Sequence, residues 1–387
     1  MQLFLKNKLS KMKNLNSHPF LNKKMNVAGK WFINLLVAAG LLFTGCKKED
    51  GHQKEITVHK GKSIQAAIDA AVGSTLIKIE PGIYKEALKI NKPGISLIGL
   101  GGEKKGSVVI QNPGDEENGI TVNENGDGFE LKNVTVKGFE ENGVFLTGVD
   151  GFVLDNVSAV NNGEYGLFPV LSTNGIIKNC SATGSSDTGI YVGQSTNILV
   201  THNWAFANVS GFEIENCSNV KVSENESYNN AGGLLVFLLP GLTIKTSSGI
   251  LVEDNNIHDN NHINFAPPGG GFETFIPSGS GVLLVGADNV TFKQNTIRNN
   301  NFVGIATVST LVLGSLAGIP PGAFADIEPN PDGTKIIQNI VKQNGAVAPP
   351  GLPLPPADLL WDGSGTNNCW KNNVYGTSFP AVLPVCM

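Results

Sequence analysis

GFELKNVTV (residues 128–136), GFVLDNVSA (151–159) and GIIKNCSA (175–182) are three copies of one pattern, a short β-rich run with an asparagine near its end. Five further copies follow, at residues 198–206, 220–228, 249–258, 290–298 and 334–342. Aligned, the copies place these asparagines in one column: Asn133, Asn156, Asn179, Asn203, Asn225, Asn255, Asn295 and Asn339. The early copies lie 22 to 24 residues apart, a spacing typical of repeat architectures.

A second marker recurs with the same period. Glycine followed by an apolar residue is found at Gly143, Gly166, Gly189, Gly211, Gly233, Gly281 and Gly304. A short repeat with two or three strands predicts one coil of an all-β fold, the right-handed single-stranded parallel β-helix. We expect the asparagines to form an inward amide ladder between coils, and the glycines to occupy turns with positive φ.

Both ends of such a helix need a cover, because an open strand edge invites aggregation. Residues 63–72 have the pattern of a short amphipathic helix with Ser63 as its N-cap. We expect this capping helix to plug the N-terminal mouth, the β-helix to occupy residues 56–345, and a C-terminal capping tail to occupy 346–387.

Four cysteines follow Cys46. Cys369 and Cys386 lie close together in the C-terminal tail, and we expect them to pair in an oxidising compartment. Cys180 and Cys217 fall at different repeat positions, so we expect free buried thiols there.

Residues 1–45 have the features of a signal peptide, with Met25 as a possible true start. An apolar run at 31–43 follows lysines and is too short to span a bilayer comfortably. It ends just before Cys46 in a sequence that resembles a lipobox, which predicts a lipidated linker over 46–55. We therefore expect an outer-membrane lipoprotein, facing the cell surface or the periplasm and held by its lipid alone. The alternative is an ordinary signal peptide with an incidental cysteine.

The formal net charge is −5 and no basic block occurs, so nucleic acid is not expected as a partner. Segments that interrupt the repeat occur only in the later coils, at residues 238–248, 260–280, 310–332 and 346–358. All four flank the glycine-marked strand. We therefore expect them to gather on one side of the helix and to wall a groove, where function usually resides.

One column of side chains suggests a binding surface. The residues three past each aligned asparagine are Val136, Ala159, Ala182, Phe206, Tyr228, His258, Arg298 and Lys342. If the preceding residue points inward, the last five form an outward stripe, aromatic at one end and cationic at the other. Such a stripe suits an acidic polysaccharide. A second outward column contains Phe145, Phe168, Tyr191 and Glu213, unless loops cover it.

A candidate catalytic site lies in the segment NNIHDNNHINF (residues 255–265). A histidine beside a carboxylate, such as His258 beside Asp259, is able to move a proton near neutral pH. We expect a uronate lyase or epimerase type of site, in which Arg298 or Lys293 neutralises the substrate carboxylate. His262 and Glu273 are further substrate-binding candidates, and Glu253 and Asp254 are close in sequence. The alternative is that these groups merely complete a turn. No metal or cofactor is expected.

Residues 63–342 resemble a family of exported parallel β-helix repeat proteins in the pectin lyase-like superfamily. The motifs that carry the resemblance are GFEIENCSNVKVSENESYNNAGGLLVFLLPGL (211–242) and NNIHDNNHINFAPPGG (255–270). The resemblance implies the fold and export, but no reaction and no catalytic residues. More distantly, the chain resembles polysaccharide lyases and alginate epimerases that share the coil.

Two functions remain open. The first is a cell-envelope lipoprotein that binds or modifies an acidic polysaccharide. The second is a non-catalytic scaffold for another exported protein, favoured by the apolar residues at 235–239 and 346–360 and by Phe272 and Phe275.

Overall fold

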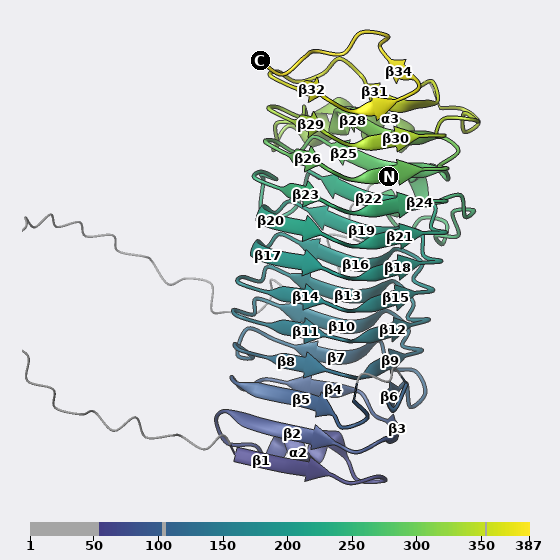
Figure 1. The fold of residues 1–387 in the computed structure, drawn as a ribbon. Coiled ribbons are helices and arrows are strands. Elements are labelled where there is room, and N and C mark those ends of the chain that lie inside the picture. Colours follow the sequence, from purple (N-terminus) through teal and green to yellow (C-terminus); the bar gives the residue numbers. More distant parts are fainter. Residues whose placement is uncertain (1–53, 103–105, 353) are drawn as a thin grey trace, which may run out of the picture.

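The computed structural model describes residues 54–102, 106–352 and 354–387. Within these ranges the chain winds into coils, and each coil adds one strand to each of three parallel sheets (Figure 1). The coils stack from β1 and α2 at one end to β34 at the other. The predicted right-handed parallel β-helix is therefore confirmed. The signal peptide, Met25, the lipidated Cys46 and nearly all of the predicted linker lie outside the described residues.

Sheet A has twelve described strands: β1 (Lys54–Val58), β2 (Thr75–Ile79), β5 (Ile95–Gly99), β8 (Glu130–Lys132), β11 (Val153–Asp155), β14 (Ile176–Lys178), β17 (Thr196–Thr201), β20 (Ser218–Ser223), β23 (Leu251–Glu253), β26 (Thr291–Lys293), β29 (Lys335–Ile337) and β32 (Cys369–Lys371). Sheet B has eleven: β3 (Gly82–Lys85), β6 (Val108–Gln111), β9 (Thr135–Lys137), β12 (Ser158–Val160), β15 (Ser181–Thr183), β18 (Trp204–Phe206), β21 (Glu226–Tyr228), β24 (Asn256–His258), β27 (Thr296–Arg298), β30 (Ile340–Lys342) and β33 (Val374–Tyr375). Sheet C also has eleven: β4 (Leu88–Ile90), β7 (Asn118–Val122), β10 (Asn142–Thr147), β13 (Tyr165–Val170), β16 (Thr188–Gly193), β19 (Ser210–Glu215), β22 (Gly232–Phe237), β25 (Ser280–Val285), β28 (Val303–Val308), β31 (Ala357–Trp361) and β34 (Ser378–Phe379).

The core is a set of stacked apolar columns. In sheet A, Leu131 pairs with Leu154, Leu154 with Ile177, and Ile177 with Val200. None of these four side chains is exposed to solvent. Because side chains alternate along a strand, the neighbours of these residues point outward, and each coil buries its inner face only through the coils above and below.

The predicted amide ladder is present from Asn203 onward. The side-chain amide of Asn203 donates to Asn225, that of Asn225 to Asn255, and that of Asn255 to Asn295. The ladder continues to Asn339 and then to Asn373. A buried amide is tolerated only when its hydrogen bonds are made, and the stacked coils make them.

The first three aligned asparagines were assigned to this ladder wrongly. Asn133, Asn156 and Asn179 have φ of 57°, 53° and 56° and lie one residue earlier, at the turn between sheets A and B. In the later coils this turn position holds other residues, such as His202 and Asp254. Asparagine suits both places, because it tolerates positive φ and also bonds its own kind.

A second buried ladder runs at the turn between sheets B and C. Asn208 donates to Asn230, Asn230 to Asn260, and Asn260 to Asn300. The ladder ends with Asn300 bonded to Asn344 and Asn344 bonded to Asp358. Two amide ladders therefore tie the later coils together at both ends of sheet B.

The seven marker glycines were predicted to occupy turns with positive φ, but the structure shows a different reason for glycine at these positions. None of the seven has positive φ. A Cβ on Gly166 would lie 2.4 Å from the carbonyl oxygen of Gly189, and one on Gly233 would lie 2.5 Å from that of Gly281. Glycine is needed here because successive coils approach too closely for a side chain.

The N-terminal cap follows the prediction. Helix α2 (Ile64–Ala70) has Ser63 as its N-cap, which accepts a hydrogen bond from the backbone N–H of Ala66, and it buries Ile64 and Ile68. At the other end the sheets continue into the predicted tail through β31 to β34, and Cys369 and Cys386 form a disulfide there. Cys180 and Cys217 are buried thiols that take no part in the disulfide, as predicted.

The interrupting segments pack onto the outer face of sheet C. They contain α3 (Thr310–Leu316) and two short 3-10 helices, η1 (Phe272–Phe275) and η2 (Pro321–Phe324). With the outward residues of sheet C they form a second apolar core, which includes Leu235, Phe237, Leu283, Phe272 and Phe324. The segments do gather on one side, as predicted, but they cover the sheet. Shallow grooves lie among these segments, one between Val312 and Gly351 and another between Leu313 and Leu354.

In the part of the chain that the structure describes, no helix has the length and apolar character required to cross a membrane.

Candidate functional site

The predicted stripe exists as a geometric feature on the outer face of sheet B. Strand register pairs Phe206 with Tyr228, Tyr228 with His258, His258 with Arg298, and Arg298 with Lys342. These pairs join β18, β21, β24, β27 and β30, which are neighbouring rungs in Figure 1. Adjacent strands lie about 4.8 Å apart, so the stripe presents one side chain for every coil.

The stripe continues toward the N-terminus with residues other than those predicted. Phe206 pairs with Thr183, and the column then runs through Val160 to Lys137. Val136, Ala159 and Ala182, which we had placed in the column, point inward and are buried. The error has the same cause as that in the amide ladder, because the early asparagines lie one position out of register.

The aromatic half of the stripe is a continuous stack. The rings of Phe206 and Tyr228 lie 5.2 Å apart with an interplanar angle of 8°, and those of Tyr228 and His258 lie 5.5 Å apart at 8°. All three side chains are half-buried. Burial, and then the charge of Glu226, raises the pKa of Tyr228, so its phenol stays neutral and able to donate a hydrogen bond.

His258 lies between two carboxylates. Its Nδ1 is 2.7 Å from an oxygen of Asp259, and its Nε2 is 3.2 Å from Oε1 of Glu226. The same oxygen of Glu226 accepts a hydrogen bond from the amide of Asn256. Glu226 was not among the site residues predicted from the sequence, although its place beside His258 follows from the register of β21 with β24. With Arg298 on the next coil, the group combines a fixed imidazole and a cation.

Three predicted residues lie elsewhere. Lys293 is on β26 in sheet A, where its Nζ is 2.8 Å from Glu253, and Glu253 also pairs with Lys221. His262 lies on the connection from β24 to sheet C, with its Nδ1 2.7 Å from the carbonyl oxygen of Ile263. The structure therefore brings neither residue into the stripe.

Glu273, the third of these residues, belongs to η1 over sheet C, near a polar cluster that the sequence did not reveal. In that cluster Tyr165 donates to Asp187 at 2.5 Å, and Tyr191 donates to Glu215 at 2.9 Å. Burial raises the pKa of both tyrosines well above the ordinary value.

The hydroxyl of Thr188 donates to Glu213, which completes the cluster. Tyr191 and Glu213 belong to the second predicted column, and both are buried. Phe145 and Phe168, from the same column, are half-buried and stack at 5.3 Å. In this column, Phe145 and Phe168, which precede the first interrupting segment in the sequence, are therefore the rings that are partly exposed to solvent.

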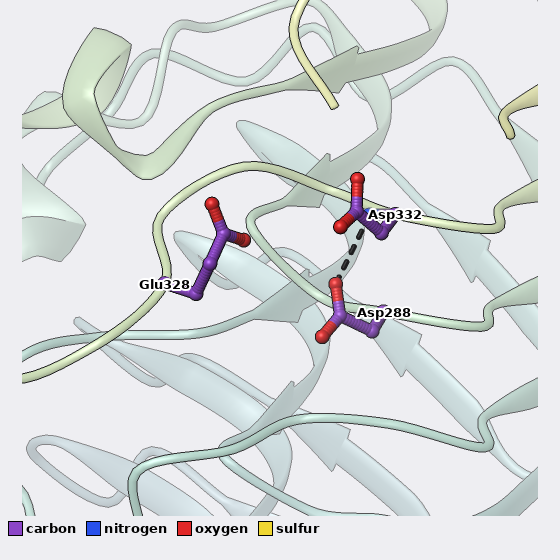
Figure 2. Close-up of side chains that lie close together, drawn as sticks. All are labelled: Asp288, Glu328 and Asp332. Atoms are coloured by element: carbon purple, nitrogen blue, oxygen red, sulfur yellow. Dashed lines mark hydrogen bonds between the residues drawn. The ribbon is translucent and has the colours of Figure 1, made fainter. Parts of the chain in front are cut away.

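Figure 2 shows a group of three carboxylates among the described residues. Asp288 and Asp332 lie on successive turns that lead into sheet A, and Glu328 approaches from the segment after α3. One oxygen from each lies within 4.8 Å of the others. Asp288 accepts a hydrogen bond from the backbone N–H of Asp332, and Glu328 accepts two from Asn330. These oxygens have the chemistry of a site for a hard cation, but their bonds also complete the local turns.

The stacked columns and the coil define the class of this protein, a right-handed parallel β-helix repeat protein. The family model described as "Right handed beta helix region" matches residues 118–240 and 238–312, which together span half of the chain. The chain belongs to that family. No curated protein matches its sequence.

Solved structures share the fold. The A-module of the Azotobacter vinelandii mannuronan C-5 epimerase AlgE6 superposes with a TM-score of 0.60 at 19% identity, over 81% of this chain and 83% of that module. The A-module of the epimerase AlgE4 from the same organism gives 0.55 at 19% identity, over 84% and 92%. At this identity the likeness establishes the fold alone.

Proposed function

We propose that the protein binds an acidic polysaccharide along the outer face of sheet B. The observation that carries this proposal is the register-locked stripe, in which three stacked rings on successive coils are followed by Arg298 and Lys342. The epimerase modules of the same fold have a polysaccharide in their names, but the proposal depends on the stripe.

The spacing of the stripe favours a polymer. Coils repeat about every 4.8 Å, so an extended glycan along the helix axis contacts one side chain per coil. Sugar rings present apolar C–H faces that stack on Phe206 and Tyr228, and cations attract sugar carboxylates. Because the rings of Phe206, Tyr228 and His258 are already stacked on one another, they lose little side-chain freedom on binding.

The same face supports proton transfer. We assign to Nε2 of His258 the removal of the proton next to the carboxylate of a uronate unit, with the substrate displacing Glu226 from that nitrogen, Asp259 fixing the ring through Nδ1, and Arg298 pairing with the substrate carboxylate. The carbanion formed is either protonated from the opposite face by a water molecule, which is epimerisation, or expels the neighbouring glycosidic oxygen, which takes up a proton from water, and this is a lyase reaction; His258 then returns its proton to solvent. Both steps balance without a cofactor.

The proposed location is the outer membrane, with the β-helix facing the cell surface or the periplasm and a lipid on Cys46 as its only anchor. This proposal is supported by the lysines, the apolar run and the lipobox-like sequence of residues 23–46. A glycan of the cell envelope is within reach of a protein anchored there.

The alternative function, a non-catalytic scaffold for another exported protein, was based on apolar residues that were expected to be exposed. Leu235, Phe237, Phe272 and Leu360, which suggested a surface for another exported protein, are buried in the second core. Partner binding on this side would have to use the surface of the interrupting segments, where Ile263 and Val347 are exposed.

Affinity electrophoresis through gels that contain acidic or neutral polysaccharides tests the proposal. We expect an acidic glycan to retard the protein, and Tyr228→Ala to weaken binding about tenfold, the equivalent of one lost ring stack. Arg298→Ala should do the same, whereas Lys335→Ala, which removes one cation from sheet A, should not. No retardation in any gel would refute the proposal. Ultraviolet absorbance of unsaturated products and NMR of the sugar protons then report lyase and epimerase activity, which His258→Ala should abolish.

A further inference from the structure

We infer that the recognised polysaccharide carries its acidic units singly, each separated from the next by neutral units. This inference rests on the proposed function and names the substrate class of the same site. It follows from the order of charges along sheet B, which is not uniform.

The two cations occupy adjacent coils. Arg298 on β27 pairs in register with Lys342 on β30. At a coil spacing of about 4.8 Å, one carboxylate lying between them contacts both. Arginine binds a carboxylate through two parallel hydrogen bonds, which fixes the orientation of the sugar unit that carries it. The part of the stripe from β18 to β30 therefore has one position for an acidic unit, at β27 and β30, and the next cation of the column is Lys137 on β9.

The next two coils carry the opposite charge. Glu226 lies on β21, and Asp259 follows β24 directly. Both contact His258, and whether or not the imidazole carries a proton, the three groups together remain negative. A sugar carboxylate over these coils would be repelled, and a repulsive group of this kind is an effective source of specificity. A neutral unit meets no such penalty and stacks on Tyr228, which leaves His258 beside the uronate held by Arg298.

Neutral side chains continue beyond these coils. Trp204 and Phe206 lie on β18, and Thr183 and Val160 extend the column. The side chain of Trp204 is 40% exposed although it is large and apolar. The exposed part of this residue, on the same strand as Phe206, suits the apolar face of an uncharged sugar. The surface thus accepts an acidic unit at one end and neutral units over at least three coils.

A homopolymer of uronates fits this pattern poorly, because every unit is charged and some must lie over Glu226 and Asp259. A heteropolymer in which a uronate alternates with an uncharged sugar places its carboxylate at Arg298 and its neutral unit over the carboxylates. The inferred ligand class is therefore an alternating or sparsely charged heteropolysaccharide.

Binding of three probes to the purified protein at one fixed ionic strength tests the inference. The probes are hyaluronan, in which a uronate alternates with an uncharged amino sugar, polygalacturonate, in which every unit is acidic, and the neutral dextran. We expect hyaluronan to bind at least about tenfold more tightly than polygalacturonate, and dextran to bind most weakly. The double variant Glu226→Gln, Asp259→Asn should improve polygalacturonate binding and narrow that ratio several-fold.

The matched control is Glu130→Gln, Asp155→Asn, which removes two carboxylates from sheet A and should leave the ratio unchanged. Tighter or equal binding of polygalacturonate by the unmodified protein overturns the inference and leaves the proposed function standing. A ratio that the double variant does not alter also overturns it. Absence of binding to every probe, together with no retardation by any acidic glycan in the electrophoresis above, defeats the proposed function itself.

Discussion

Removing one rung of the buried amide ladder should destabilise the β-helix far more than removing an exposed amide. Among the described residues, Oδ1 of Asn255 accepts hydrogen bonds from the backbone and the amide of Asn225, and its two amide N–H groups are shared among the carbonyl oxygens of Val222 and Glu253 and Oδ1 of Asn295, which makes about four bonds in all. A buried hydrogen bond contributes about 1 kcal/mol net, and the groups left behind stay buried without their partner. Asn255→Ala should therefore cost about 4 kcal/mol.

The assay is denaturant unfolding followed by circular dichroism, with the change in unfolding free energy taken from the midpoint at an unchanged m value. The matched control is Asn219→Gly. Asn219 is exposed, has φ of 53°, and donates to Asn197, so glycine keeps its backbone and removes one solvated bond. This control should cost about 1 kcal/mol or less. A cost for Asn255→Ala no larger than that for Asn219→Gly would show that the ladder does not hold the coils together.

Three further predictions concern charge and cross-linking. Hydrogen bonds from two lysines lower the pKa of Glu253, so its ionised side chain stabilises the folded state at neutral pH, and this stabilisation is lost as the pH falls through the lowered pKa. Glu253→Gln should therefore reduce the unfolding free energy by about 1 kcal/mol or less near neutrality and leave it unchanged in acid. Denaturant unfolding at a series of pH values measures this difference. Burial raises the pKa of Asp288, so ionisation of this carboxyl group destabilises the folded state above that pKa. With a chelator present, Asp288→Asn should raise the unfolding midpoint at neutral pH and leave it unchanged in acid. A lower unfolding midpoint at neutral pH would contradict this prediction. The Cys369–Cys386 disulfide closes a separation of 17 residues, so replacing both cysteines by serine should cost about 3 kcal/mol in calorimetry, and an unchanged transition would contradict that estimate.

The fold was predictable because the same residue types recur at the same positions of a repeat of nearly constant length. In coil after coil, an apolar residue lies two places from a polar turn residue. Stacked parallel strands are the arrangement that buries all of these apolar residues together. The error of register in the early coils shows the limit of such alignment. Asn156 and Asn203 are the same residue type, yet one occupies a turn with positive φ and the other an inward ladder one position later.

The stripe was predictable because it lies on strands, where register alone decides which side chains become neighbours. The polar cluster over sheet C was not, because Tyr165, Asp187 and Glu215 meet only when three coils stack and the cluster becomes buried. The same holds for Asp288 and Asp332, which are 44 residues apart in sequence and adjacent in space. Groups brought together by an irregular segment leave no period for sequence reasoning to detect.

The claim that sheet B is the glycan-binding face is tested most directly by the crystal structure of the protein with a hyaluronan tetrasaccharide. We predict an oligosaccharide along the helix axis, with an uncharged ring stacked on Tyr228 and a uronate carboxylate within ion-pair distance of Arg298. An oligosaccharide bound over the outer face of sheet C, beside Tyr165 and Glu213, would contradict the account and assign recognition to the cluster there.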